Sequence, residues 1–266
     1  MYKTYFGFKE KPFGKTPDPR FLFLSSGHEE ALARLEFVLV EREIAVLTGD
    51  IGCGKTTLSR ALMDRLGDGY RFSFIVNPRL NASEFLRTTA RLLEIEKPSD
   101  TKDGLLEQIN SAVYKNYQKG ICPVIVIDEA QMITDAEVFD EIRLLTNFQM
   151  DDRNLISVII MGQPELRDIL ASPRFEPLRQ RISLHYHLLP LSAEETMEYL
   201  DFRLEVAGGS AGLFTPDAVQ KIFELTSGVP RRINSMATNA LLVAYGCDAA
   251  LIDSIIIDEI KDELML

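Results

Sequence analysis

One glycine-rich stretch constrains the fold of this chain more than any other feature: Gly49-Asp50-Ile51-Gly52-Cys53-Gly54-Lys55-Thr56. It fits the pattern G-x-x-x-x-G-K-[ST] and lies between an apolar run at 44–48, which predicts a strand, and a helical pattern at 56–66. Glycines in such a loop let successive main-chain N–H groups point inward at phosphates. The competing interpretation, a plain glycine turn with a surface lysine, is disfavoured by the strand-then-helix context. The sequence therefore predicts a phosphate-binding loop.

Each part of this loop has an expected task. Lys55 is placed to neutralise phosphate charge, and the hydroxyl of Thr56 is expected to ligate Mg²⁺. The positive end of the following helix, at Thr56 and Thr57, favours the same anion. Cys53 is either a small space-filling residue or a reactive thiol, and the first interpretation is favoured. The predicted nucleotide-binding residues of the loop are Gly49, Gly52, Cys53, Gly54, Lys55, Thr56 and Thr57.

Two carboxylates, Asp128 and Glu129, follow an apolar strand predicted over 123–127. Asp128 is expected to hold Mg²⁺ through its water shell, and Glu129 to orient and deprotonate an attacking water. An aspartate alone would leave a small-molecule kinase or a switch GTPase open, whereas the adjacent glutamate favours hydrolysis of ATP to ADP and phosphate. The competing interpretation is two exposed acids at a strand exit, and the separate loop match disfavours it.

Strand and helix patterns alternate along the first 190 residues, and only helices follow. Alternation of this kind builds a parallel sheet with helices on both faces. We therefore predict a doubly wound, five-stranded α/β body over 1–190, which includes the aromatic N-terminal segment, and a small all-α lid over 191–266. The expected strands are 44–48, 72–76, 123–127, 155–161 and 183–188. The expected helices are one opened by a capping box at Ser26 and Glu29, then 56–66, 83–93, 104–117, 136–148, 192–206, 216–227, 230–245 and 254–264.

Composition excludes several classes of protein. The chain is 46% hydrophobic and 26% charged, which excludes an intrinsically disordered chain. Three scattered cysteines indicate neither a disulfide framework nor a metal cluster, and they fit a reducing, cytoplasmic setting. The N-terminus lacks the apolar core of a signal peptide, and no apolar run approaches the roughly 18 residues that a membrane helix needs. We therefore expect that the chain as given does not enter a membrane.

Charge is placed unevenly along the chain. The net charge is −11, and residues 191–266 hold 13 acidic against 5 basic residues, so the first 190 residues carry only −3. This shift agrees with the predicted boundary near Pro190. The acidic excess argues against a dominant nucleic-acid surface, because phosphate binding needs clustered lysine and arginine. A local basic ring that forms only in an oligomer stays open.

With two motifs further along the chain, the loop and the acidic pair resemble those of AAA+ ATPases. Gln163 follows the fourth predicted strand, where this family places a polar sensor beside the γ-phosphate. Gly228-Val229-Pro230-Arg231 resembles the sensor-2 motif, whose arginine reaches from the lid to the nucleotide. Asn77, after the second strand, is either a restraint on Glu129 or a turn residue.

The same resemblance implies an arginine finger that completes the site of a neighbouring subunit by stabilising transition-state charge. Arg181 is favoured for this role over Arg179, and Arg174 is a third candidate. Lys55, Glu129 and Arg181 are thus the expected catalytic residues. For Arg181 and Arg231 the competing interpretation is a solvated or ion-paired side chain at the surface.

The resemblance narrows to the ExeA/general secretion pathway protein A ATPases. The matching blocks span nearly the whole chain: Phe6-Gly7-Phe8, Pro12-Phe13, Thr16-Pro17-Asp18-Pro19-Arg20-Phe21, Asp128-Glu129-Ala130-Gln131, Gly162-Gln163-Pro164-Glu165-Leu166, Leu178-Arg179-Gln180-Arg181-Ile182 and Gly228-Val229-Pro230-Arg231-Arg232-Ile233-Asn234. Members of this family commonly continue into a transmembrane helix and a periplasmic peptidoglycan-binding domain, which are missing here. We therefore expect a cytoplasmic ATPase region or a free-standing paralogue that serves pili, polysaccharide export or another envelope system.

The resemblance implies an oligomerising ATPase, with ATP and Mg²⁺ as cofactors, that drives assembly or remodelling of an envelope or secretion complex. Its implied partners are further copies of the chain and an envelope protein. A nucleic-acid-associated AAA+ switch, such as a transposition helper or an initiator-like ATPase, is the alternative, and an acidic lid without a recognisable helix-turn-helix counts against it. A nucleotide-gated scaffold is disfavoured by the intact Glu129, and a P-loop kinase by the lack of an acceptor-binding signature.

The N-terminal segment is rich in aromatic residues and has three interpretations. It docks on a neighbouring subunit, it lines an adenine pocket, or it packs against its own domain. The third is favoured, because exposed aromatic clusters are costly in soluble chains. The residues concerned are Tyr2, Tyr5, Phe6, Phe8 and Phe13.

Overall fold

The computed structural model describes residues 2–14, 18–150 and 153–261. It divides into two compact units. Unit 1 comprises residues 1–28, 50–57 and 189–266, and unit 2 comprises residues 29–49 and 58–188. Both units are discontinuous in sequence, so the boundary near Pro190 stays a prediction. The structure differs from it in grouping the N-terminal segment with the C-terminal helices.

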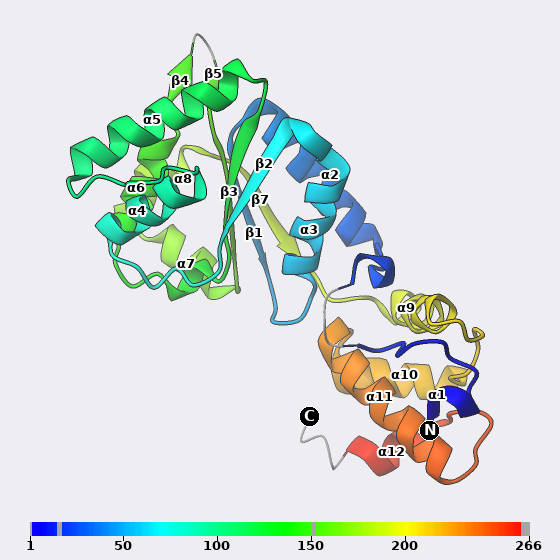
Figure 1. Ribbon diagram of the computed structural model, residues 1–266. Helices are drawn as coiled ribbons and strands as arrows, with labels where there is room; N and C mark the ends of the chain where they lie inside the picture. Colours follow the sequence, from blue (N-terminus) through cyan, green and yellow to red (C-terminus); the bar gives the residue numbers. More distant parts are fainter. Residues whose placement is uncertain (1, 15–17, 151–152, 262–266) are drawn as a thin grey trace. The chain divides into compact units, whose positions relative to one another are not determined.

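Unit 2 is built on a parallel sheet, as the sequence predicted. Within the described residues this sheet has five strands in the order β2-β3-β6-β1-β7, so the chain crosses over between most neighbouring strands (Figure 1). Such crossovers need helices on both faces. The strands are β1 (Ile44–Gly49), β2 (Tyr70–Ile75), β3 (Cys122–Ile127), β6 (Ser157–Gly162) and β7 (Ile182–Leu188).

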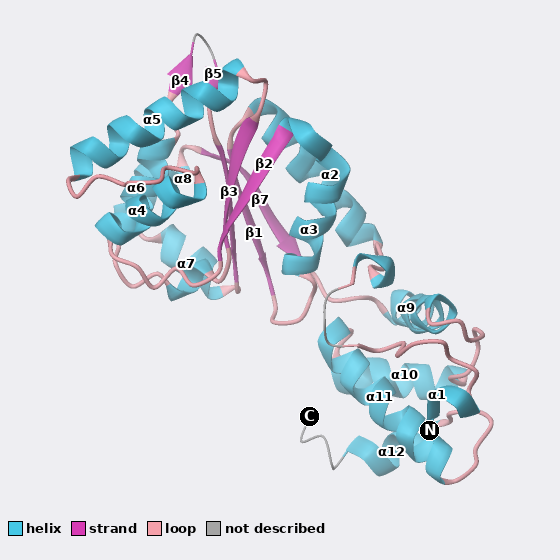
Figure 2. Cartoon of the chain, in the orientation of Figure 1, coloured by secondary structure: helices cyan, strands magenta, loops and turns pink. Residues whose placement is uncertain are grey.

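Helices cover both faces of this sheet, and the predicted α/β fold class is confirmed. Figure 1 shows α2 and α3 on one side and α4 to α8 on the other, and Figure 2 sets the helices apart from the strands by colour. The sequence analysis did not predict the short helices α7 and α8, which lie between the fourth and fifth predicted strands. The bounds are α2 (Ser26–Glu41), α3 (Lys55–Leu66), α4 (Ala82–Leu92), α5 (Lys102–Gln118), α6 (Glu137–Leu145), α7 (Glu165–Ala171) and α8 (Glu176–Arg179).

The central strands are apolar because both of their faces are buried. Every residue of β1, β3 and β6 is buried. Ile44, Ile125 and Ile160 belong to the core cluster that the sheet shares with α4, α5 and α6. Burying a large apolar side chain contributes about 1.5–3 kcal/mol of stabilising free energy, so this layered core is the main source of stability of unit 2.

Two local features differ from the prediction. Helix α6 ends at Leu145 rather than Phe148, because Thr146 caps it by donating its hydroxyl to the carbonyl of Arg143 at 2.7 Å. A short antiparallel hairpin then follows, formed by β4 (Gln149–Met150) and β5 (Arg153–Asn154). Strands of two residues carry too little pattern to be predicted.

Unit 1 holds the helices predicted after Pro190, which begin and end close to the expected positions. They are α9 (Ala193–Val206), α10 (Pro216–Thr226), α11 (Pro230–Gly246) and α12 (Ser254–Lys261), and the N-terminal α1 (Tyr2–Tyr5) packs with them (Figure 1). The predicted end of the last helix, 262–264, and Thr16-Pro17 of the matching blocks lie outside the described residues.

The N-terminal aromatic segment packs inside unit 1. Phe8 and Phe13 are buried in the core that α9 to α12 form. Arg203 of α9 is also buried: its Nε donates to the carbonyl of Pro12 at 2.7 Å, and its guanidinium lies 4.7 Å from the centre of the Phe21 ring. The segment is therefore tied to the helical unit by both apolar and polar contacts.

The cap of α2 also differs from the prediction. Ser25, not Ser26, caps the helix, since its Oγ accepts the N–H of His28 at 3.3 Å. The hydroxyl of Ser26 instead donates to the carboxylate of Glu195 at 2.7 Å. Glu195 and Ser192 form a capping box at the start of α9, so one carboxylate serves both helix ends.

Candidate nucleotide-binding site

The glycine-rich loop leaves the sheet at the end of β1 and enters α3 at Lys55. Gly52 and Gly54 have φ of +91° and +102°, a region that side chains other than glycine rarely adopt. The carbonyl of Asp50 accepts the N–H of Cys53 at 3.3 Å and the Nζ of Lys55 at 3.1 Å. The loop thus folds back on itself, with its lysine on the inside of the turn.

A buried histidine supports this loop from the start of α2. The Nε2 of His28 lies 3.0 Å from the carbonyl oxygen of Cys53, and its Nδ1 lies 2.7 Å from Oγ of Ser25. Burial lowers the pKa of His28, so the ring is neutral at pH 7. In the tautomer that satisfies both contacts, Nε2–H donates to Cys53 and Nδ1 accepts from Ser25.

Sequence reasoning missed His28, although a signal was present. His28 precedes Leu32, Leu35 and Leu39 at helical spacing, which places it on the buried face of α2. A histidine on that face needs polar partners.

The first turn of α11 packs against the same loop. The N–H of Arg231 donates to the carbonyl of Gly52 at 3.3 Å. A Cβ at Gly52 would lie 2.5 Å from the Cβ of Arg231, so only glycine fits here. The side chain of Arg231 itself is exposed. The residue predicted to sense the nucleotide therefore touches the loop through its backbone and Cβ.

The thiol of Cys53 is fully buried in the loop. Burial raises its pKa to about 11, so it stays protonated at neutral pH. A protonated, buried thiol is a poor nucleophile. These observations support the space-filling interpretation.

The acidic pair stands at the carboxyl end of β3. Asp128 is buried, and its Oδ1 accepts the N–H of Glu129 at 2.9 Å. Glu129 has φ of +53°, in the left-handed region, which costs a residue other than glycine about 1–3 kcal/mol. A strained backbone persists only where the surrounding structure holds it, and such residues cluster at functional sites.

Glu129 is held from the neighbouring strand. Its Oε2 accepts the Nε2 of Gln163 at 3.1 Å, just after β6, and the Nε2 of Gln131 at 2.6 Å. Since β3 and β6 are adjacent, their carboxyl ends bring these side chains together. Of the predicted residues, Glu129 and Gln163 are thus joined by a direct hydrogen bond, and Gln131 is a member that sequence reasoning quoted but did not assign.

The three candidate arginines differ in what they contact. Arg179 donates to the carbonyls of Leu170 and Ala171, at 3.2 and 2.6 Å, and forms an ion pair with Glu176. Arg181 is exposed and makes one long contact, 3.5 Å, with the hydroxyl of Thr146. Arg174 is exposed beside the ring of Phe175. Arg179 therefore caps the C-terminal end of α7 through these carbonyl groups.

Comparisons with known proteins agree with this arrangement. The family model described as an AAA domain matches residues 39–170. General secretion pathway protein A of Aeromonas hydrophila is 39% identical over 249 residues, which is 92% of this chain. The chain belongs to the AAA+ family. The resemblance to general secretion pathway protein A is confirmed, and this AAA+ chain spans 45% of the length of that relative.

Solved structures share the fold of this AAA+ chain. The Aeropyrum pernix ORC2 protein, solved as ADPNP-ADP complexes, superposes with a TM-score of 0.72 at 18% identity over 96% of this chain and 72% of its own. The Aeropyrum pernix ORC1 protein in complex with DNA gives 0.67 at 18% identity, over 97% and 70%. At such identity the likeness concerns the fold alone.

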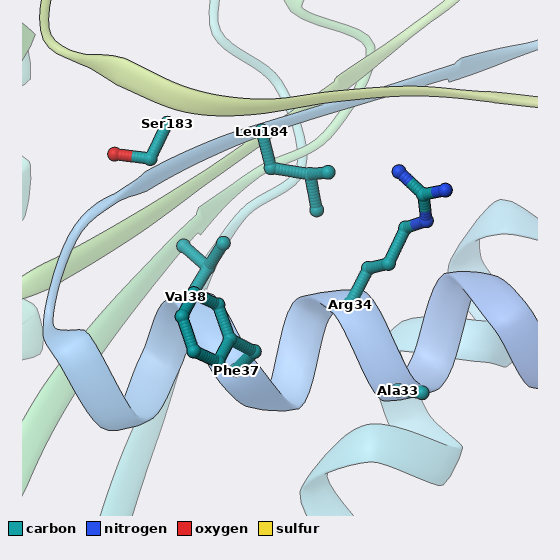
Figure 3. A pocket seen from close by; sticks show the side chains of 6 residues that line it. All are labelled: Ala33, Arg34, Phe37, Val38, Ser183 and Leu184. Carbon is teal, nitrogen blue, oxygen red and sulfur yellow. The ribbon is translucent and has the colours of Figure 1, made fainter.

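Other features of the AAA+ chain lie outside this cluster. A cavity of about 340 Å³ opens between α2 and the first half of β7, with Phe37, Val38 and Leu184 as apolar walls and Arg34 at its rim (Figure 3). Its mostly apolar lining offers little chemistry. Asn77 follows β2 with an exposed side chain, so its proposed restraint on Glu129 stays a prediction.

The residue types predicted to hold the metal are ones that Mg²⁺ accepts. Asp128 offers a carboxylate and Thr56 a hydroxyl, hard oxygens of the kind that Mg²⁺ combines with phosphate oxygens and water. That the two hold one metal ion together stays a prediction. Across residues 2–14, 18–150 and 153–261, no group of three or more His, Cys, Asp or Glu side chains forms a metal site on its own. In the same part of the chain, no helix is long and apolar enough to span a membrane.

Proposed function

We propose that this chain is an oligomerising ATPase that hydrolyses Mg²⁺-bound ATP and uses the cycle to assemble or remodel an envelope or secretion complex. The observation that carries the proposal is the hydrogen bond between Glu129 and Gln163. It joins the proposed base, at the end of β3, to the proposed γ-phosphate sensor, at the end of β6, and β6 neighbours β1, the strand that leads into the phosphate loop.

The proposed chemistry is phosphoryl transfer to water, in which positioning and charge stabilisation do most of the work. Glu129 takes the proton of the water as its oxygen attacks the γ-phosphorus and the bond to the leaving ADP oxygen breaks. Lys55 neutralises phosphate charge, and Thr56 and Asp128 would hold the metal. Mg²⁺ held there would supply positive charge that offsets the charge of the phosphates. Gln163 and Arg231 respond to the presence of the γ-phosphate.

The other predicted members of the nucleotide site belong to the loop itself. Gly49, Gly52, Cys53, Gly54 and Thr57 are proposed to shape it and to offer main-chain N–H groups to the phosphates. The tight turn at Gly52 and Gly54 supports this role, because both glycines adopt the positive φ that it needs.

We propose Arg181 as the arginine finger of a neighbouring subunit. It is exposed, and among the described residues it makes a long contact with the hydroxyl of Thr146, whereas Arg179 hydrogen-bonds carbonyls of its own chain. A finger in trans leaves each site incomplete without its neighbour, so turnover per subunit should rise with protein concentration.

The envelope role rests on the name of the Aeromonas relative, which is a general secretion pathway protein. Cys53, Cys122 and Cys247 are free thiols, which suits a reducing compartment, so the cytoplasm is the proposed location. An envelope protein is the proposed partner because of the likeness to the Aeromonas relative.

Steady-state ATPase activity against protein concentration tests the proposal. Wild type is compared with Glu129→Gln and with Arg181→Ala. Activity per subunit is expected to rise with concentration and to collapse in both variants. An equal mixture of the two should recover part of the turnover, since intact Glu129 and intact Arg181 then meet at one interface. If turnover per subunit did not depend on protein concentration, the proposed site shared between subunits would be wrong. If wild type turned over ATP no faster than Glu129→Gln, the proposed ATPase activity would be wrong.

A further inference from the structure

Gln131 closes a ring of hydrogen bonds between two strand ends. It lies in the single 3₁₀ turn Ala130–Met132 that follows Glu129. Its Nε2 donates to Oε2 of Glu129 at 2.6 Å, and its Oε1 accepts the main-chain N–H of Gln163 at 3.1 Å. The side chain of Gln163 completes the ring by donating to the same Oε2 at 3.1 Å.

The ring uses both hydrogen-bonding groups of the Gln131 amide. Its oxygen accepts a main-chain N–H on one side and its NH₂ donates to a carboxylate on the other, which fixes the orientation of the amide. The neighbouring backbone also leaves room for the side chain of Gln131. A Cβ at Gly162 would lie 2.8 Å from Oε1 of Gln131, so the glycine at the end of β6 makes room for this amide.

The ring also sets what Glu129 can do. Two amide N–H groups occupy Oε2, so a water that uses this oxygen has to replace one of them. The contact of Gln131 is the shorter, and Gln131 is anchored to the main chain of Gln163. The contact of Gln163 is longer, and its side chain is the one proposed to turn toward a γ-phosphate.

We propose that Gln131 is a positioning residue that couples Gln163 to Glu129. When the amide of Gln163 turns to phosphate, Gln131 keeps the carboxylate of Glu129 oriented and leaves one position on Oε2 for the attacking water. The inference rests on the proposed ATPase function and adds the residue by which sensing is passed to the base. Gln131 itself exchanges no proton with water.

Methionine replacements test the coupling, because methionine keeps the length of glutamine and removes both hydrogen-bonding groups. We would measure kcat, KM and ATP affinity for Gln131→Met, Gln163→Met and the double variant. Each single change is expected to lower kcat about tenfold, and ATP affinity should fall only through lost recognition of the γ-phosphate. The double variant should be no slower than the slower single variant, since both break one ring. An approximately hundredfold loss in the double variant, the product of independent effects, would overturn the coupling.

A second measurement does not depend on turnover. The ratio of the dissociation constants of ADP and a non-hydrolysable ATP analogue reports how strongly the chain senses the γ-phosphate. This ratio should fall in Gln163→Met, and to a similar extent in Gln131→Met. A wild-type ratio in Gln131→Met would overturn the inference whether or not the chain hydrolyses ATP. Wild-type turnover no greater than that of Glu129→Gln would overturn only the proposed function. Melting temperatures should stay within about 3 °C of wild type, because a general loss of packing would shift them further.

Discussion

The Nε2 of His28 lies 3.0 Å from the carbonyl oxygen of Cys53, so a buried neutral histidine holds the middle of the phosphate loop. The contact connects the start of α2 to the segment that has to receive a nucleotide. Because the ring has a partner on each nitrogen, it can neither rotate nor leave without breaking a buried hydrogen bond.

We predict that His28→Leu weakens ATP binding about tenfold. The variant keeps an apolar body but leaves the carbonyl of Cys53 without its donor, and an unsatisfied buried group costs about 1–3 kcal/mol. Fluorescence titration with a labelled ATP measures the change. Ser25→Ala is the matched control, because it removes the partner of Nδ1 and leaves the contact with Cys53; it should change affinity less than about threefold. Equal affinities for His28→Leu and wild type would contradict this role.

The same residue predicts how stability depends on pH. Burial lowers the pKa of His28, so below the unfolded value of about 6.5 the unfolded chain binds a proton that the folded chain does not. Stability is therefore greatest above that pH and falls as the pH drops below it, by at most about 1.4 kcal/mol per pH unit for one histidine. Urea unfolding from pH 7.5 to 5 measures this slope.

His28→Gln should reduce that slope, because the titrating group is gone. His185 is the internal control: burial and the nearby charges of Arg167 and Arg179 lower its pKa as well, so His185→Gln should remove a separate part of the slope. A slope unchanged in both variants would mean that other groups set the acid response.

The contact of Gly52 with Arg231 predicts a strong effect of Gly52→Ala. The new Cβ would meet the Cβ of Arg231 at 2.5 Å, at a φ that already disfavours alanine. Either the loop or the first turn of α11 has to shift, so ATP binding should fall below detection at about a hundred times the wild-type dissociation constant. Gly67→Ala is the matched control: its φ is +62° with nothing within 4 Å, so it adds strain without a clash and should leave ATP affinity unchanged.

The elements that follow local pattern were predictable, and those set by distant contacts were not. The apolar run of β3 between polar neighbours identified a buried parallel strand, and the helices after Pro190 followed their own periodicity and turn residues. The packing of the N-terminal segment depends on contacts such as Arg203 with Pro12, 191 residues apart, and no local pattern reports them.

The candidate site shows the same division. The phosphate loop and the acidic pair are contiguous motifs, so their residue types and spacing were enough to single them out. The ring that Gln131 closes needs β3 and β6 to be neighbours and Gly162 to leave room for an amide. The first condition comes from sheet order, which a single sequence leaves open, and the role of Gly162 becomes visible only once that order is known.

Thiol labelling should distinguish the three cysteines. Cys247 is exposed and is expected to react within minutes with a disulfide reagent. Cys53 is buried with its pKa raised to about 11, and burial also raises the pKa of Cys122, so both should react only when the chain opens. The number of fast-reacting thiols per chain, read by absorbance, should be one in buffer and three in denaturant. Fast labelling of Cys53 in the folded chain would support the reactive-thiol interpretation instead.

The contacts of Arg179 and Arg181 predict opposite phenotypes for two neighbouring arginines. Arg179 holds the carbonyls of Leu170 and Ala171, so Arg179→Ala should lower the free energy of unfolding by about 1 kcal/mol and leave turnover within about threefold of wild type. Within the part of the chain that the structure describes, Arg181 makes a long contact with Thr146, so Arg181→Ala should leave the free energy of unfolding nearly unchanged and lower turnover at least a hundredfold, as loss of a finger does. Urea unfolding and ATPase activity, measured on both variants, separate the two residues. If Arg179→Ala lost turnover without losing stability, the finger would be Arg179, and its bonds to α7 would have to break when a neighbour binds.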